Sequence, residues 1–175
     1  MVSPPARQDH ARSLREAFSL YPTGVVALAA SIGGERVGMA VNSFTSVSLD
    51  PALVAVSAAR TSRTWPRLSA APELGMSVLA DHHGDLSRRL ASREGDRFAG
   101  HRWTDTPGGA LLLEGAALWL SCRPHSRFDG GDHEIALYEI VDVEVFSQVR
   151  PLVFHQSQYR AIEHPEQPAR TAAAS

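Results

Sequence analysis

Short apolar stretches separated by turn residues recur along the chain and predict a β-rich fold. Residues 25–32 form a continuous β-prone apolar run. Gly33-Gly34 then signals a tight hairpin turn, and residues 35–41 return as the partner strand. Further strands are predicted over residues 53–57, 74–79, 116–123, 134–146 and 152–154.

Alternation of apolar and polar positions is clearest in the long segment 134–146 and is typical of a strand with one buried face. The alternation slips near residues 138–141, which predicts a β-bulge there. Helical spacing predicts short helices over residues 12–20, 62–68 and 85–91. With several short strands and only short helices, the pattern favours an all-β antiparallel barrel decorated by helices.

Length and composition indicate one globular domain. The chain has 175 residues, of which 43% are apolar. We expect the domain to cover residues 12–162, between a flexible N-terminus (1–11) and a flexible Pro- and Ala-rich tail (163–175). The predicted polar loop 93–109 carries two aromatic anchors, Phe98 and Trp103.

Charge and cysteine content disfavour several classes of protein. The formal net charge is −2 and no dense basic cluster is present, so a nucleic-acid partner is not expected. No apolar run reaches the roughly 18 residues of a membrane span, and the N-terminus lacks the apolar core of a signal peptide. The single cysteine, Cys122, cannot form an internal disulfide and fits a reducing, cytoplasmic setting.

The first candidate for chemistry is a run of hydroxyl and amide side chains at residues 42–48. Such a run could offer hydroxyls and backbone N–H groups to the polar edge of a flat aromatic ligand. It could equally be a polar loop that satisfies its own backbone through side-chain hydrogen bonds.

The second candidate is the segment 60–64, which follows a buried strand and is rich in arginine and hydroxyl groups. Hydroxyls and guanidinium groups at the start of a helix bind phosphate readily. The alternative is an ordinary helix cap with solvated arginines.

The third candidate is His133, which follows the turn Gly130-Gly131-Asp132. The glycines permit a tight turn and a close approach of ligand, and the imidazole can donate a hydrogen bond or titrate near neutrality. Asp132 is placed to orient the ring. The alternative is a loop histidine bonded to backbone.

Other catalytic arrangements have little support in the sequence. His82, His83 and His101 lack metal-ligand spacing, and there is no cysteine pair. No Gly-x-Gly-x-x-Gly turn links a strand to a helix, and no serine lies in a nucleophile elbow.

Several motifs in order along the chain resemble those of the flavin reductase family, the small reductase components of two-component flavin monooxygenases. The resemblance covers residues 14 to 162 and is specific through the order and spacing of its elements. The motifs are Pro22-Thr23-Gly24, the segment 38–51, Ser62-Arg63-Thr64-Trp65, Asp96-Arg97-Phe98-Ala99-Gly100 with Trp103, Leu113-Glu114-Gly115-Ala116 with Cys122, Gly130-Gly131-Asp132-His133, and Pro151-Leu152 with Tyr159.

The resemblance implies an FMN-binding split β-barrel, Greek-key-like and antiparallel, that forms a homodimer with the flavin near the subunit junction. It implies reduction of FMN or FAD by NADH or NADPH, with transfer of the free reduced flavin to a partner monooxygenase. NADH is favoured because no basic pair marks a 2′-phosphate pocket. His133 is expected to position the nicotinamide.

Taken with the residue patterns, the resemblance predicts the following cofactor-binding residues: Thr23, Asn42, Ser43, Phe44, Thr45, Ser48, Leu49, Ser57, Arg60, Ser62, Arg63, Thr64, Trp65, Phe98, Asp132, His133 and Tyr159. The chain departs from the family at Ala40, where Thr is common, at Ala52, where a second Pro is common, and at Tyr138, where Gly is usual. The last departure bears on packing or on nicotinamide access.

Two other functions remain open on the sequence. One is a flavin- or heme-binding barrel without reductase turnover, against which the Gly-Gly-Asp-His turn argues. The other is an oxidoreductase that keeps its flavin and reduces a different acceptor.

Overall fold

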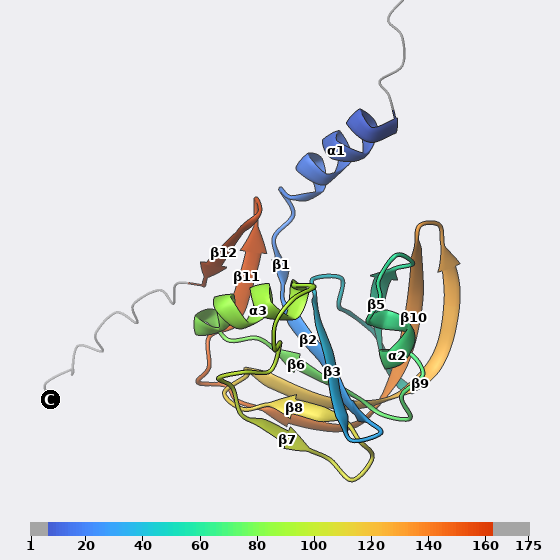
Figure 1. The fold of residues 1–175 in the computed structure, drawn as a ribbon, viewed down its shortest axis with the longest axis vertical. Helices are drawn as coiled ribbons and strands as arrows, with labels where there is room; N and C mark the ends of the chain where they lie inside the picture. The colour runs from blue at the N-terminus through green and yellow to red at the C-terminus, as the bar shows by residue number, and fades with distance from the viewer. Residues whose placement is uncertain (1–6, 163–175) are drawn as a thin grey trace, which may run out of the picture.

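A seven-stranded antiparallel sheet curls into the body of the protein in the computed structural model, which describes residues 7–162 (Figure 1). Every pairing in the sheet is antiparallel. In spatial order its strands are β3 (Glu35–Val41), β2 (Val26–Ile32), β6 (Leu74–Val78), β9 (Leu118–Gly130), β10 (His133–Val145), β5 (Ala52–Ala59) and β4 (Thr45–Leu49).

Two small sheets and three helices complete the described part of the chain. One sheet joins β1 (Thr23–Gly24), β11 (Leu152–His155) and β12 (Gln158–Ala161), and the other joins β7 (Trp103–Asp105) and β8 (Leu111–Leu113). The helices are α1 (Arg7–Phe18), α2 (Trp65–Leu68) and α3 (Gly84–Ala91), and a 3-10 turn, η1 (Asp81–His83), leads into α3. Helix α1 extends away from the body (Figure 1). No helix in residues 7–162 is long and apolar enough to span a membrane.

Two layers of buried side chains explain why the strand β2 reads as an unbroken apolar run. Val26 and Leu28 point into the barrel interior, together with Met76 of β6. Ala27 and Ala29 point to the other side, where Leu90 of α3 covers the sheet. Because both faces of β2 are covered, no position along it needs to be polar.

Tyr138, which stands where the family usually has Gly, fills the barrel interior. Its side chain is 1% exposed, and Trp65 packs against it with ring centroids 6.5 Å apart in a T-shaped arrangement. Burial raises the pKa of the Tyr138 phenol to about 12. This departure from the family is therefore accommodated in the core.

The predicted antiparallel barrel and the predicted bulge are confirmed. The pairing of β10 with β9 shifts register between Leu137 and Tyr138 and again between Ile140 and Asp142. The first helix begins at Arg7 rather than at residue 12, so residues 7–11, which were expected to be flexible, are helical. Residues 1–6 and the expected tail 163–175 lie outside the described residues.

Five strands were not predicted at all, and the shortest of them is β1. Strand β4 runs through the hydroxyl-rich segment, and β12 follows the strand that was expected to be the last. Strands β7 and β8 lie around the end of the predicted polar loop. Strand β9 also continues seven residues past the predicted end at Arg123 and reaches the glycine turn.

Candidate functional site

Three neighbouring cavities, which share lining residues, lie along β3, α3 and the segment before β4. The first, of about 880 Å³, is lined by Asn42, His133 and Phe154, among others. The second, of about 210 Å³, shares Asn42 and Phe154 with the first and adds Ala40, Ala91 and Tyr159. The third, of about 440 Å³, shares Ala40 and Ala91 with the second. We call these three cavities together the groove.

The hydroxyl of Ser43 holds one wall of the groove in place. Its Oγ donates to the carbonyl of Ser57 at 2.7 Å and accepts from the Ser57 N–H at 3.0 Å. These bonds continue the pairing of β4 with β5 beyond Thr45, which is opposite Ala55. The Ser43 proton is therefore committed to backbone, and Ser57 contributes its backbone to the same contact.

The residues around Ser43 divide between the groove and the surface. Asn42, Phe44 and Thr45 line the first cavity, and Phe44 also packs on the barrel core. Ser48 and Leu49 lie further along β4, away from the three cavities, and Leu49 is 95% exposed.

Thr23 presents an unused polar atom at the groove. Its Oγ1 is buried and has no hydrogen-bond partner among the described residues, and the residue lines the first cavity. A buried hydroxyl without a partner costs about 1–3 kcal/mol, so a ligand that hydrogen-bonds this atom gains affinity. The polar edge of a flavin ring supplies such partners, and the residues present fit that group.

Arginine side chains converge at the far end of the groove. Arg63, Thr64 and Arg97 line the third cavity. Arg97 Nη1 donates to the Gly38 carbonyl at 2.9 Å and to the Thr64 hydroxyl at 2.8 Å, which fixes the connection before α2 against β3. Arg63 forms no salt bridge within residues 7–162 and keeps its charge for an anionic ligand.

Helix α2 is only four residues long, and its N-cap residue, Thr64, makes no side-chain cap hydrogen bond. The Trp65 N–H at the start of the helix donates instead to Ser62 Oγ at 3.1 Å. Pro66 occupies the first turn, as the sequence predicts. This region therefore offers side chains, rather than a helix end, to an anion.

Two predicted cofactor residues of this segment lie elsewhere. The side chain of Trp65 is 4% exposed and donates from Nε1 to Glu134 at 3.0 Å, so it belongs to the barrel core. Arg60 binds the β9–β10 turn, with Nε donating to the Gly131 carbonyl at 3.1 Å and Nη2 to Asp129 at 3.0 Å. Both side chains face a separate cavity beside Glu134, and neither lines the groove.

His133 stands at the first cavity with Asp132 beside it. Its Nδ1 lies 2.7 Å from Asp132 Oδ1, and 44% of the His133 side chain is exposed. The hydrogen bond to His133 holds the pKa of the Asp132 carboxyl below its usual value. An ionised Asp132 keeps the proton on Nδ1 and leaves Nε2 available for a ligand.

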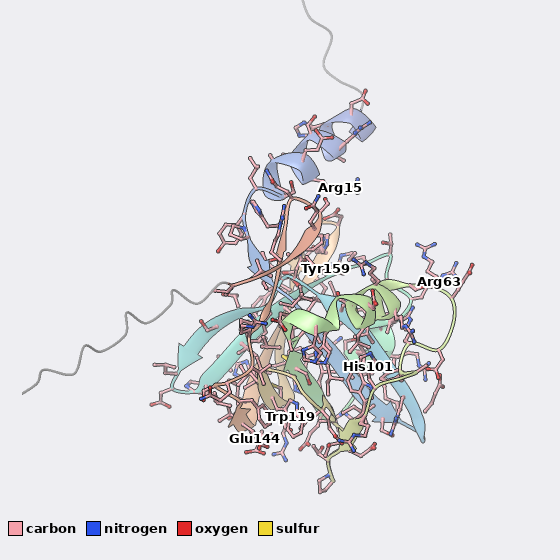
Figure 2. The ribbon with its side chains drawn as sticks, turned by 90° about the vertical axis from the view of Figure 1, so that its left-hand side faces the viewer. Arg15, Arg63, His101, Trp119, Glu144 and Tyr159 are labelled. Carbon is pink, nitrogen blue, oxygen red and sulfur yellow. The ribbon has the colours of Figure 1, made fainter. Side chains whose placement is uncertain are left out.

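Tyr159 and Phe98 border the groove in different ways. Tyr159 donates from its hydroxyl to Ser87 Oγ at 2.8 Å and is covered by the Arg88 guanidinium at 5.0 Å from the ring centroid. Figure 2 shows Tyr159 and Arg63 toward the two ends of α3. Phe98 packs edge-on against Trp103 at 5.0 Å and lines a further cavity beyond the groove.

Sequence reasoning missed three residues that shape the groove. Phe154 joins the first two cavities, and Arg97 connects Gly38 to Thr64. Arg15, near the end of α1, lines the first cavity with His133. Of the three, only Arg97 lies in one of the motifs that resemble the family. Arg15 and Phe154 lie in segments with no distinctive sequence pattern.

Other reactive groups in the described residues are not arranged for chemistry of their own. Burial raises the pKa of the Cys122 thiol to about 12, so it stays protonated. No group of three ligating side chains within residues 7–162 is placed to hold a metal ion.

An antiparallel split barrel with a polar-edged groove of this kind defines a class of flavin-binding oxidoreductases. Residues 18–163 match the family of flavin reductase like domains, and the chain belongs to this family. The expected family, the expected fold and the expected enzyme class, a flavin reductase that uses flavin and NADH, are confirmed.

Similar proteins include reductases of known systems. A flavin reductase of Pseudomonas putida is 37% identical over 146 residues, which cover 83% of this chain and 86% of that protein. The reductase subunit HsaB of a flavin-dependent monooxygenase from Rhodococcus jostii is 34% identical over 152 residues, covering 87% and 78%.

Solved structures extend the similarity to nearly the whole chain. Nitrilotriacetate monooxygenase component B from Mycobacterium thermoresistibile aligns with a TM-score of 0.86 at 30% identity and covers 97% of this chain and 98% of its own. The NADH:FAD oxidoreductase SgcE6 of Streptomyces globisporus, in complex with NAD and FAD fragments, aligns with a TM-score of 0.85 at 31% identity, covering 95% and 100%.

Proposed function

We propose that this protein uses NADH to reduce free flavin and releases the reduced flavin to a partner monooxygenase. One observation carries the proposal: a single groove has His133 at one end and the unpaired Arg63 at the other. A flavin mononucleotide has a flat ring and one terminal phosphate, which matches this order of groups. The similarity to the reductase subunit of a flavin-dependent monooxygenase supports the delivery of reduced flavin to a partner.

In this proposal the flavin ring lies along residues 42–45, with Thr23 as an added hydrogen-bond partner. Arg63 and Thr64 hold the phosphate, with Arg97 keeping Thr64 in position. Tyr159 borders the ring side, and the small side chains of Ala40 and Ala91 leave room between the two ends.

The cofactors carry the chemistry, since NADH supplies a hydride that the flavin accepts. The task of this chain is alignment, because a reaction between two bound partners depends on their orientation. His133, oriented by Asp132, is placed to accept a hydrogen bond at Nε2 from the carboxamide N–H of the nicotinamide at the open side of the first cavity. No side chain is needed as a general base.

We further propose that the protein works as a homodimer in the cytoplasm, where NADH is available. Exposed apolar side chains on β10 and β4 support a dimer, because large apolar side chains that gather at the surface of a monomer often mark an interface. They are Ile135, Val141, Val143 and Val145 of β10 and Val47 and Leu49 of β4. A mass measurement in solution that gives a monomer still binding flavin would contradict the dimer.

The experiment that tests the proposed function is NADH oxidation by flavin-free protein, with and without added FMN or FAD. Oxidation that requires added flavin is expected. Binding of flavin without any oxidation would favour a carrier instead, and oxidation that requires a different acceptor would favour a flavin-retaining oxidoreductase.

A further inference from the structure

The groove does not end at Arg63 and Thr64. A fourth cavity, of about 350 Å³, shares Arg63, Thr64, Arg93 and Arg97 with the third cavity and lies beyond it. It is large enough for a small-molecule fragment, since ligand cavities begin at roughly 300 Å³. We call it the outer cavity.

Positive charge dominates the outer cavity. Two carboxylates line it, Glu35 and Asp96, against five arginines: Arg36, Arg63, Arg67, Arg93 and Arg97. Arg67 is neutralised by Glu35 at 2.7 Å, and Arg36 lies 3.5 Å from Asp105. Asp96 accepts the Phe98 N–H at 2.9 Å.

Three of these arginines have no carboxylate partner within the described residues, and one of the three, Arg97, is instead held by the Gly38 carbonyl and the Thr64 hydroxyl. Neither Arg63 nor Arg93 forms a salt bridge within the part of the chain that the structure describes. Arg63 comes from the connection between β5 and α2, and Arg93 from the loop after α3. Separate segments thus bring two unpaired guanidinium groups to the passage between the third cavity and the outer one.

We infer that the outer cavity binds the adenylate half of FAD, and that the protein prefers FAD to FMN through Arg93. The inference rests on the proposed function and adds the identity of the flavin. FMN ends in one phosphate and leaves the outer cavity empty. FAD continues with a second phosphate and an adenosine, which matches a second unpaired arginine followed by further space. Guanidinium groups bind phosphate oxygens and also stack on aromatic rings such as adenine.

The test compares the dissociation constants of FMN and FAD for the wild type and for three variants, measured by flavin fluorescence. The wild type should bind FAD at least about tenfold more tightly than FMN, as expected when a charged hydrogen bond contributes on the order of 1.5 kcal/mol or more. Arg93→Ala should remove most of this preference by weakening FAD, and Arg93→Lys should restore part of it. Arg63→Ala should weaken both flavins.

The control variant is Arg102→Ala, which removes an exposed arginine outside the cavities; Arg102 pairs with Glu114. It should leave the affinity for both flavins unchanged, which separates a local contact from the general loss of positive charge. Thermal unfolding of each variant shows whether the fold is kept.

Equal affinity of the wild type for FMN and FAD would overturn the inference, as would an equal loss of both affinities in Arg93→Ala. If NADH still reduces both flavins in that case, the proposed function stands and only the assignment of the outer cavity fails. If the protein neither binds nor reduces FMN or FAD, both the proposed function and the assignment of the outer cavity are overturned.

Discussion

The Ser43 hydroxyl is the clearest case in which one side chain decides the shape of the groove. It bridges the N–H and the carbonyl of Ser57, so Ser43→Ala leaves both groups without their partner. We expect a loss of about 1–2 kcal/mol in the free energy of unfolding, together with weaker flavin binding because the wall moves. Urea unfolding and flavin titration on the same variant measure the two effects. A loss of flavin affinity at unchanged stability would show instead that Ser43 contacts the ligand directly.

His133 has a different expected signature, because it faces the open side of the first cavity. In His133→Ala, kcat/KM for NADH should fall about 5- to 30-fold, as for a lost hydrogen bond with some misalignment. Flavin affinity should stay within about twofold, since the flavin contacts lie elsewhere in the groove. Steady-state kinetics and flavin titration decide the matter. If both affinities fall together, His133 supports the turn rather than the nicotinamide.

His83 predicts how stability depends on pH. Burial, with His82 and His101 nearby, lowers the pKa of His83 to about 4, against the weaker opposing effect of Asp81. Its Nδ1 accepts the Ala80 N–H at 3.1 Å. The folded state therefore favours neutral His83, and this contribution is complete above about pH 6.5 and lost as the pH falls toward about 4.

The matched variant is His83→Asn, whose side-chain oxygen can still accept the Ala80 N–H. Between pH 6.5 and 4 the wild type should lose up to ~3 kcal/mol more stability than the variant. Chemical unfolding at several pH values measures this difference. Parallel pH profiles for the two proteins would show that His83 is not buried in its neutral form.

At the scale of elements, the β9–β10 hairpin positions His133 from a distance. Arg60, at the end of β5, binds the Gly131 carbonyl and Asp129 in the turn. In Arg60→Ala the turn loses both contacts, so kcat/KM for NADH should fall by about two- to fivefold with little change in stability, because exposed ion pairs contribute little. NADH kinetics and flavin titration check the result. A marked loss of flavin affinity would instead return Arg60 to the phosphate site that the sequence suggested.

Most strands of the barrel could be predicted because their burial leaves a clear pattern. The fully covered β2 and the half-covered β10 follow the two standard patterns of apolar residues. Strand β4 was missed because it lies at the edge of the sheet and exposes most of its side chains. The distal part of β9 was missed for a related reason, since both faces of the hairpin there meet solvent and polar residues are tolerated on each.

The candidate site was less predictable than the strands, because the side-chain contacts depend on tertiary structure. Asn42, Arg63, Thr64 and His133 were found from sequence and do line the groove. Trp65 was misplaced because its neighbours in sequence do not reveal that its indole turns inward to Glu134. A hydrogen bond across 69 residues leaves no local signal.

On the scale of the whole molecule, the groove gains its function from joining distant segments. Residues from the start of the chain, from β3 and β4, from α3 and from the final hairpin meet along its length. The barrel supplies the rigid support that keeps these segments in place. The central claim is that this groove takes up free flavin, allows NADH to reduce it and lets the reduced flavin leave.

Turnover of free flavin under anaerobic conditions tests that claim most directly. Flavin-free protein is mixed with NADH and a large molar excess of free FAD, and the loss of the visible absorbance of the flavin is followed. The account predicts that all the FAD is reduced over many turnovers. It also predicts that the reduced flavin is found in the filtrate when the protein is retained by ultrafiltration. Reduction of only one flavin for each protein chain, with the product retained, would contradict it.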